Sequence, residues 1–165
     1  MFELKPISKE SLPRSLEKAE RYRLLNEPRV AESICRDILQ IEPQNQSALI
    51  TLILALTDQF GNAAANPKPV LELIAQLGEE YERRYYTGIV YERQGKAKLI
   101  QNVPGAGFDA YDLLHEAMTW FEQAEAIHPR GNDDAILRWN TCARLLMSDP
   151  KLVPEPDEAV HTWLE

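Results

Sequence analysis

The chain has 165 residues and a formal net charge of −8, and 44% of its residues are hydrophobic. This composition excludes a disordered or fibrous chain, and the longest apolar run, residues 48–56, is far shorter than the roughly 20 residues that span a bilayer. Residues 101–165 contain 4 basic and 12 acidic residues, which accounts for the whole negative excess and disfavours nucleic acid as a partner. This acidic half forms either a solvated surface or a face that steers a basic partner. Residues 1–11 lack the apolar core of a secretory signal, so we expect a cytoplasmic domain that does not bind membranes.

Apolar residues at helical spacing predict four helices in the first half. Leu16, Ala19 and Tyr22 recur at three-residue steps, and Pro28 stands where the start of a second helix tolerates proline. Gly61 and Gly78 end the next two helical stretches, because glycine readily adopts the left-handed conformation that closes a helix. The expected helices cover about residues 12–25, 28–41, 46–60 and 67–77.

The second half predicts two long helices, a closing helix and a tail. Helical spacing resumes at residue 79 and continues to about residue 100, residues 102–107 turn the chain, and a further helix ends before Pro129. A closing helix follows over residues 133–147. The proline-rich tail, residues 148–165, contains a short predicted helix that either docks Val160 and Trp163 on the domain, or is disordered, or is used by another chain.

Two sets of four residues share one spacing, at relative positions 0, 4, 7 and 12. They are Ala31, Cys35, Ile38 and Pro43, and Ala117, Phe121, Ala124 and Pro129. This is the pattern of the second helix of a tetratricopeptide repeat, in which small and large side chains pack against neighbouring helices and a proline ends the helix. Ala19 with Tyr22, and Gly88 with Tyr91, match the small residue and the tyrosine of the first helix.

The chain therefore resembles a tetratricopeptide-repeat protein over roughly residues 12–146. Counted from this pattern, the domain covers residues 12–147 after an N-terminal extension over residues 1–11. It consists of three repeats at about 12–45, 46–80 and 81–131, followed by a capping helix at 133–147. The third repeat contains an insertion near 96–112. The second repeat matches weakly, since Pro69 stands where the aromatic residue belongs. In the third, the pattern places a turn at Gly95, yet the next small residue, Ala117, comes 17 positions late, so we expect both helices of that hairpin to be lengthened.

The resemblance implies an all-α fold, a right-handed solenoid of about seven helices whose concave groove binds a peptide or protein partner without catalysis. Carried over position by position, the groove residues are Leu16, Glu20, Arg23, Ile50, Leu54, Thr57, Tyr85, Ile89, Glu92, Arg93, Ile136 and Asn140. Tyr85 and Arg93 are the contacts we expect first, because tyrosine and arginine supply much of the binding energy at interfaces. Glu20 stands at a key position of the carboxylate clamp found in some members, so that clamp is not supported.

Other chemistry finds little support in the residues. His115 and Glu116 open a zinc-protease pattern, but Thr119 stands where the second histidine is required, and we expect no metal, no cofactor and no enzymatic activity. Cys35 and Cys142 are expected to be reduced packing residues. The tyrosines over residues 81–91 either cover the core or form a peptide-binding face. We therefore predict an adaptor that binds a partner segment; the alternative is a homodimer formed through the lengthened hairpin and the tail.

Overall fold

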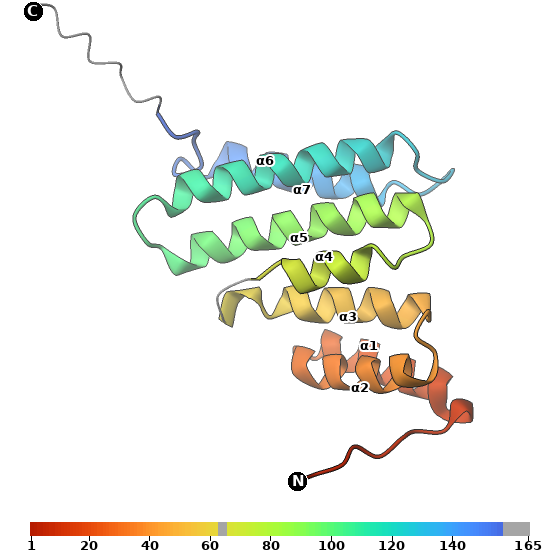
Figure 1. Ribbon diagram of the computed structural model, residues 1–165. Coiled ribbons are helices and arrows are strands. Elements are labelled where there is room, and N and C mark those ends of the chain that lie inside the picture. Colours follow the sequence, from red (N-terminus) through yellow and green to blue (C-terminus); the bar gives the residue numbers. More distant parts are fainter. Residues whose placement is uncertain (63–65, 157–165) are drawn as a thin grey trace, which may run out of the picture.

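The computed structural model describes residues 1–62 and 66–156, and the regular secondary structure of this part of the chain is all helical (Figure 1). Its α-helices are α1 (Leu12–Leu24), α2 (Pro28–Ile41), α3 (Gln46–Asp58), α4 (Lys68–Ile74), α5 (Glu80–Gln101), α6 (Ala106–Glu125) and α7 (Asp134–Ser148). Two short 3-10 turns, η1 (Lys9–Ser11) and η2 (Phe60–Asn62), accompany them. No strand is present in the described ranges, so the all-α prediction is confirmed. The short helix predicted in the tail, with Val160 and Trp163, lies outside the described residues.

Local signals explain several helix ends. The Asn45 side-chain oxygen accepts a hydrogen bond of 3.0 Å from the backbone N–H of Ala48, which caps the first turn of α3. Pro28 begins α2, where its missing N–H costs no helical hydrogen bond. The turn between α5 and α6 contains two left-handed residues, Asn102 with φ 49° and Gly105 with φ 81°. Asparagine and glycine tolerate that conformation, so the chain reverses there.

The residues of the shared spacing form the buried faces of α2 and α6. In α2 these are Ala31, Cys35 and Ile38, and in α6 they are Ala117, Phe121 and Ala124; each is 0% exposed. Steps of four and three residues keep such side chains on one side of a helix. Burying a side chain of the size of Phe121 contributes about 1.5–3 kcal/mol through the hydrophobic effect alone. The buried faces of these two helices could thus be read directly from the sequence.

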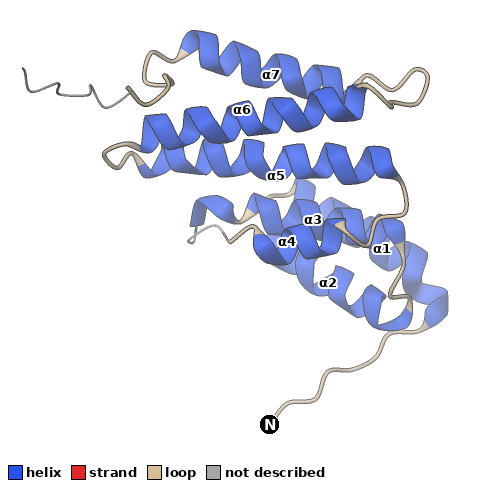
Figure 2. Cartoon of the chain, turned by 45° about the horizontal axis from the view of Figure 1, so that its top comes forward, coloured by secondary structure: helices blue, strands red, loops and turns tan. Residues whose placement is uncertain are grey.

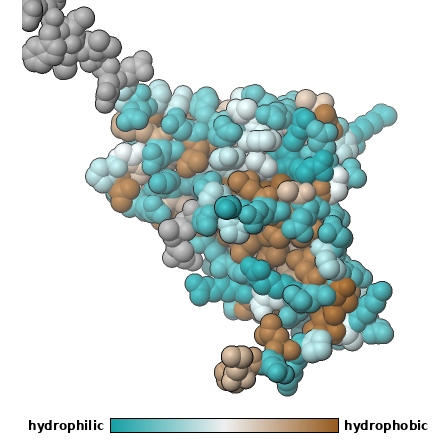
Figure 3. Space-filling view, viewed as in Figure 1, coloured by the Kyte–Doolittle hydropathy of each residue, from teal (hydrophilic) through white to brown (hydrophobic). Residues whose placement is uncertain are grey.

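Each helix packs against the next along the chain, and α3 also contacts α1 and α5. In Figure 1, α1 lies behind α2 and α7 lies behind α6. In Figure 2 the helices follow one another from α7 at the top, through α6 and α5, to the group formed by α1–α4. On the side seen in Figure 3, apolar residues gather over α3 and α4. Leu71 and Leu73 of the short α4 are only partly buried.

The hairpin of α5 and α6 packs closely because α5 has glycine at two contact positions. A Cβ atom added to Gly88 would lie 2.5 Å from Cε1 of Phe121, and one added to Gly95 would lie 3.1 Å from Cγ of Leu114. Gly95 therefore lies inside α5 and contacts α6, and α5 continues past the place where the repeat pattern puts a turn. The start of the tail returns to this hairpin, because Leu152 is 4% exposed within the same core cluster.

Candidate functional site

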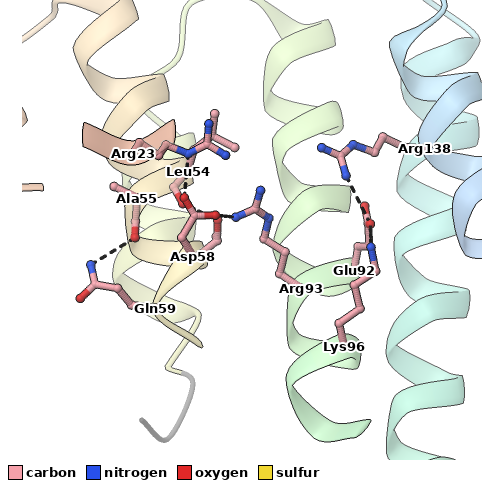
Figure 4. Close-up of polar contacts among 10 residues, drawn as sticks. Arg23, Leu54, Ala55, Asp58, Gln59, Glu92, Arg93, Lys96 and Arg138 are labelled. Atoms are coloured by element: carbon pink, nitrogen blue, oxygen red, sulfur yellow. Dashed lines mark hydrogen bonds and ion pairs between the residues drawn. The ribbon is translucent and has the colours of Figure 1, made fainter. Parts of the chain in front are cut away.

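A row of charged side chains connects α1, α3 and α5 (Figure 4). Nε of Arg23, near the end of α1, lies 2.7 Å from Oδ2 of Asp58, the last residue of α3. Arg93 of α5 donates a hydrogen bond to the other carboxylate oxygen of Asp58. One carboxylate thus holds two arginines that are 70 positions apart in the sequence.

The row continues from α5 to α7 through Glu92. The Glu92 side chain is fully buried, and its Oε1 atom accepts hydrogen bonds from Lys96 of the same helix and from Arg138 of α7, the latter at 3.4 Å. Its second oxygen, Oε2, has no hydrogen-bond partner among the residues described. A buried carboxylate is tolerated only where cations compensate its charge, so Glu92 ties Arg138 to the centre of the row.

We call the side of the molecule marked by Arg23, Asp58, Arg93 and Arg138 the odd-helix face. Its row contains four cationic side chains, those of Arg23, Arg93, Lys96 and Arg138, and the two carboxylates of Asp58 and Glu92, so two positive charges stay uncompensated within it. The chain as a whole carries a net charge of −8, which makes this row an exception to its surroundings.

Burial and neighbouring charges shift the pKa values of the three arginines in this row. Burial, with Arg23 and Arg138 nearby, lowers the pKa of Arg93 to about 10, and burial together with Arg138 lowers the pKa of Arg23. Burial acts in the same direction on Arg138, but the charge of Glu92 and the hydrogen bond with Tyr85 together outweigh it and raise the pKa of Arg138. All three guanidinium groups are protonated at neutral pH, and a further carboxylate would relieve their mutual repulsion.

Tyrosines lie beside this row on the first turns of α5. The rings of Tyr81 and Tyr85 stack with centroids 5.9 Å apart, and the ring of Tyr86 meets that of Tyr85 edge-on at 5.1 Å. Tyr85 also lies 5.9 Å from the buried ring of Phe121. Burial raises the pKa of Tyr85, which keeps its hydroxyl group neutral. Tyr85 therefore supports the core with one part of its ring while it borders the odd-helix face.

The predicted groove residues fall into three groups in the structure. Arg23, Glu92 and Arg93 belong to the charged row. Leu54 and Tyr85 are partly buried against the core cluster of α5 and α6, Glu20 is exposed, and Ile136 and Asn140 are half-buried on α7. Leu16 and Ile50 are partly buried against other core clusters, whereas Thr57 and Ile89 are buried, at 2% and 1% exposed. Ile89 and Glu92 are thus buried beneath the odd-helix face and are not exposed on it.

Sequence reasoning missed Asp58, Lys96 and Arg138, since the repeat pattern singles out the helix positions expected to face a groove. One feature of the sequence does indicate that Arg93 pairs with another helix. Arg93 has no acidic residue three or four positions away on its own helix, where Ile89, Val90, Lys96 and Ala97 stand. A half-buried arginine without a local partner requires one from another helix.

Two further observations concern histidine, cysteine and acidic side chains. Within residues 1–62 and 66–156, no three histidine, cysteine or acidic side chains are grouped so that they could hold a metal ion. Cys35 and Cys142 are free and buried, and burial raises the pKa of each thiol to about 12. No helix in the described ranges is both long and apolar enough to cross a membrane. Comparison with known proteins finds no matching family model, no similar curated protein and no similar solved structure.

Proposed function

We propose that this chain is a tetratricopeptide-like solenoid that acts as a protein-interaction module and binds a segment of a partner protein along the odd-helix face. The observation that carries this proposal is the charged row itself, to which α1, α3, α5 and α7 each contribute side chains. Contacts of α3 with both α1 and α5, and the shared buried spacing in α2 and α6, support a stack of helix hairpins. In such a stack, alternate helices line a single surface.

The chemistry of the row favours a partner segment that carries carboxylates. The side chains of Arg23, Arg93 and Arg138 are 23%, 18% and 35% exposed, so each is largely held by the protein but still partly accessible to a partner. Arginine binds a carboxylate with two parallel hydrogen bonds and is enriched among the residues that dominate interface energies. Because their conformations are already restrained by Asp58 and Glu92, these side chains lose less entropy on binding.

A selection from a library of displayed peptide segments tests this proposal. We expect the recovered segments to contain aspartate or glutamate, and the double variant Arg23→Gln, Arg138→Gln to weaken their binding by about tenfold or more, equivalent to about 1.4 kcal/mol. Fluorescence anisotropy with labelled segments gives the affinity. The control is Arg144→Gln, which makes the same chemical change at an exposed position of α7.

Circular dichroism and thermal unfolding of each variant separate a loss of binding from a loss of folding. If the double variant remains folded and binds the segments as tightly as the original chain, the odd-helix face is not the binding surface. If no segment is recovered, the interaction function itself is wrong.

A second candidate function is self-association through the tip of the α5–α6 hairpin. Ile100 and Val103 are 74% and 52% exposed there, and Val153 of the tail is 43% exposed. Val103 and Val153 border a cavity of about 420 Å³ between the tip and the tail. If this apolar surface is a dimer interface, light scattering will give twice the monomer mass, and Ile100→Ser with Val103→Ser will return it to the monomer. A monomeric mass at all concentrations would leave only the first candidate.

A further inference from the structure

A pocket of about 240 Å³ lies between the N-terminal ends of α5 and α7. Its walls combine three aromatic rings with three carboxylates: Tyr81, Tyr85, Tyr86, Glu79, Glu82 and Asp134. Glu82 and Tyr85 stand three residues apart on α5, and Arg93 follows them on the same side of that helix. The pocket therefore opens at one end of the odd-helix face.

The aromatic wall has a defined geometry. The Tyr81 and Tyr85 rings are nearly parallel, with 11° between their planes, whereas Tyr86 stands at 79° to Tyr85. The Tyr81 hydroxyl donates a hydrogen bond of 3.2 Å to Oδ1 of Asn132, which fixes the outer ring. The face of an aromatic ring attracts a cation, since the ring carries negative charge density on its face.

The carboxylates of the pocket have no counter-ion within the part of the chain that the structure describes. Glu79, Glu82 and Asp134 take part in none of its ion pairs. Of the neighbouring cations, Arg83 donates to the carbonyls of Leu77 and Gly78. Arg138 pairs with the buried Glu92, and its charge also acts on Tyr85 at the wall of the pocket. Burial and the nearby Glu79 raise the pKa of Glu82, as expected for a carboxylate that lacks a compensating positive charge.

We propose that this pocket binds a cationic side chain, the ammonium of lysine or the guanidinium of arginine, from the segment that occupies the odd-helix face. The inference rests on the proposed function and adds the chemistry of the partner. Three carboxylates without an ion-pair partner attract the charge, and the tyrosine rings surround the apolar stem and contact the cationic head. A neutral or acidic side chain would gain neither interaction.

The positions of the two sites also predict a spacing in the partner. Glu82 and Arg93 are separated by 11 positions of α5, or about 16 Å at 1.5 Å per residue. An extended segment covers that distance with about five residues at roughly 3.3 Å each. The partner should therefore carry a lysine or arginine about five positions from an aspartate or glutamate.

Tetramethylammonium chloride is a direct probe of the pocket. In an NMR titration of the full chain at constant ionic strength, we expect saturable shifts of the ring signals of Tyr81, Tyr85 and Tyr86, but not of Tyr22 or Tyr111. Glu82→Gln and Asp134→Asn should each weaken binding of the probe about two- to fivefold. Asp112→Asn, the same loss of charge at an exposed position of α6, should leave it unchanged.

The inference is overturned if the ring signals do not shift, if the neutral isostere neopentyl alcohol shifts them equally, or if the acidic variants bind tetramethylammonium as the original chain does. A purely structural role of the carboxylates would lower the melting temperature without changing the affinity. The displayed segments separate the two proposals. If binding of the segments is weakened by changes at Arg23 and Arg138 but not at Glu82 or Asp134, the proposed function is supported and the cation pocket is excluded. If no segment is recovered, the proposed function is overturned instead.

Discussion

The hairpins α1–α2 and α5–α6 use the same pattern of buried positions with different residues. In α5–α6, Phe121 packs against Gly88, which leaves no room for a Cβ atom. In α1–α2, the smaller Cys35 lies in one buried cluster with Ala19 and Leu52. The large Phe121 thus faces glycine, the smallest residue, whereas the medium-sized Cys35 lies with the small Ala19. The comparison teaches that each hairpin sets its larger residue against a correspondingly smaller one, as close-packed interiors require.

The largest effect should come from removing the large partner in the second hairpin. Phe121→Ala deletes a fully buried ring beside a glycine that cannot fill the space, and we expect a loss of about 3–5 kcal/mol in the free energy of unfolding. Cys35→Ala, the corresponding change in the first hairpin, should cost only about 1 kcal/mol. Urea unfolding followed by circular dichroism measures both. Equal losses in the two variants would contradict the volume-matching explanation.

A smaller effect should come from enlarging the small partner. The methyl group introduced by Gly88→Ala would lie 2.5 Å from the Phe121 ring, and we expect a loss of about 1–3 kcal/mol despite the better helix propensity of alanine. Adding Phe121→Leu should make the double variant more stable than the sum of the two single changes predicts. Strict additivity in this cycle would show that the two residues do not compete for one space.

The smallest effect concerns the thiol of the first hairpin. Burial raises the pKa of Cys35 from 9.0 to about 12, so at pH 9 the thiol ionises in the unfolded chain but not in the folded one. The protonated Cys35 thiol contributes its full stabilisation well below pH 9. This contribution falls by about 0.4 kcal/mol between pH 7 and pH 9, and it continues to fall until about pH 12. Cys35→Ala should therefore show a correspondingly weaker decline in stability over that interval. An identical pH dependence in both chains would mean that the Cys35 thiol is accessible to solvent.

The candidate site was only partly predictable. Arg23, Glu92 and Arg93 were named from the sequence, because the repeat pattern places them at positions expected to share one surface. Asp58 and Arg138, which connect them, follow from no local pattern, since ion pairs between helices depend on how those helices pack. Ile89 shows the same limit: it occupies a position that the pattern assigns to the groove, yet the close approach of α5 and α6 buries it.

The sequence by itself determined the helical class, the approximate helix ends and the buried faces of α2 and α6. Those features depend on helical periodicity, caps and turn residues, which act within a few positions of the chain. Only the tertiary structure decided that one aspartate holds arginines from two other helices, that Glu92 is buried between Lys96 and Arg138, and that three tyrosines and three carboxylates enclose one pocket. These depend on distances between helices that are remote in the sequence, and such distances arise only when the whole core packs.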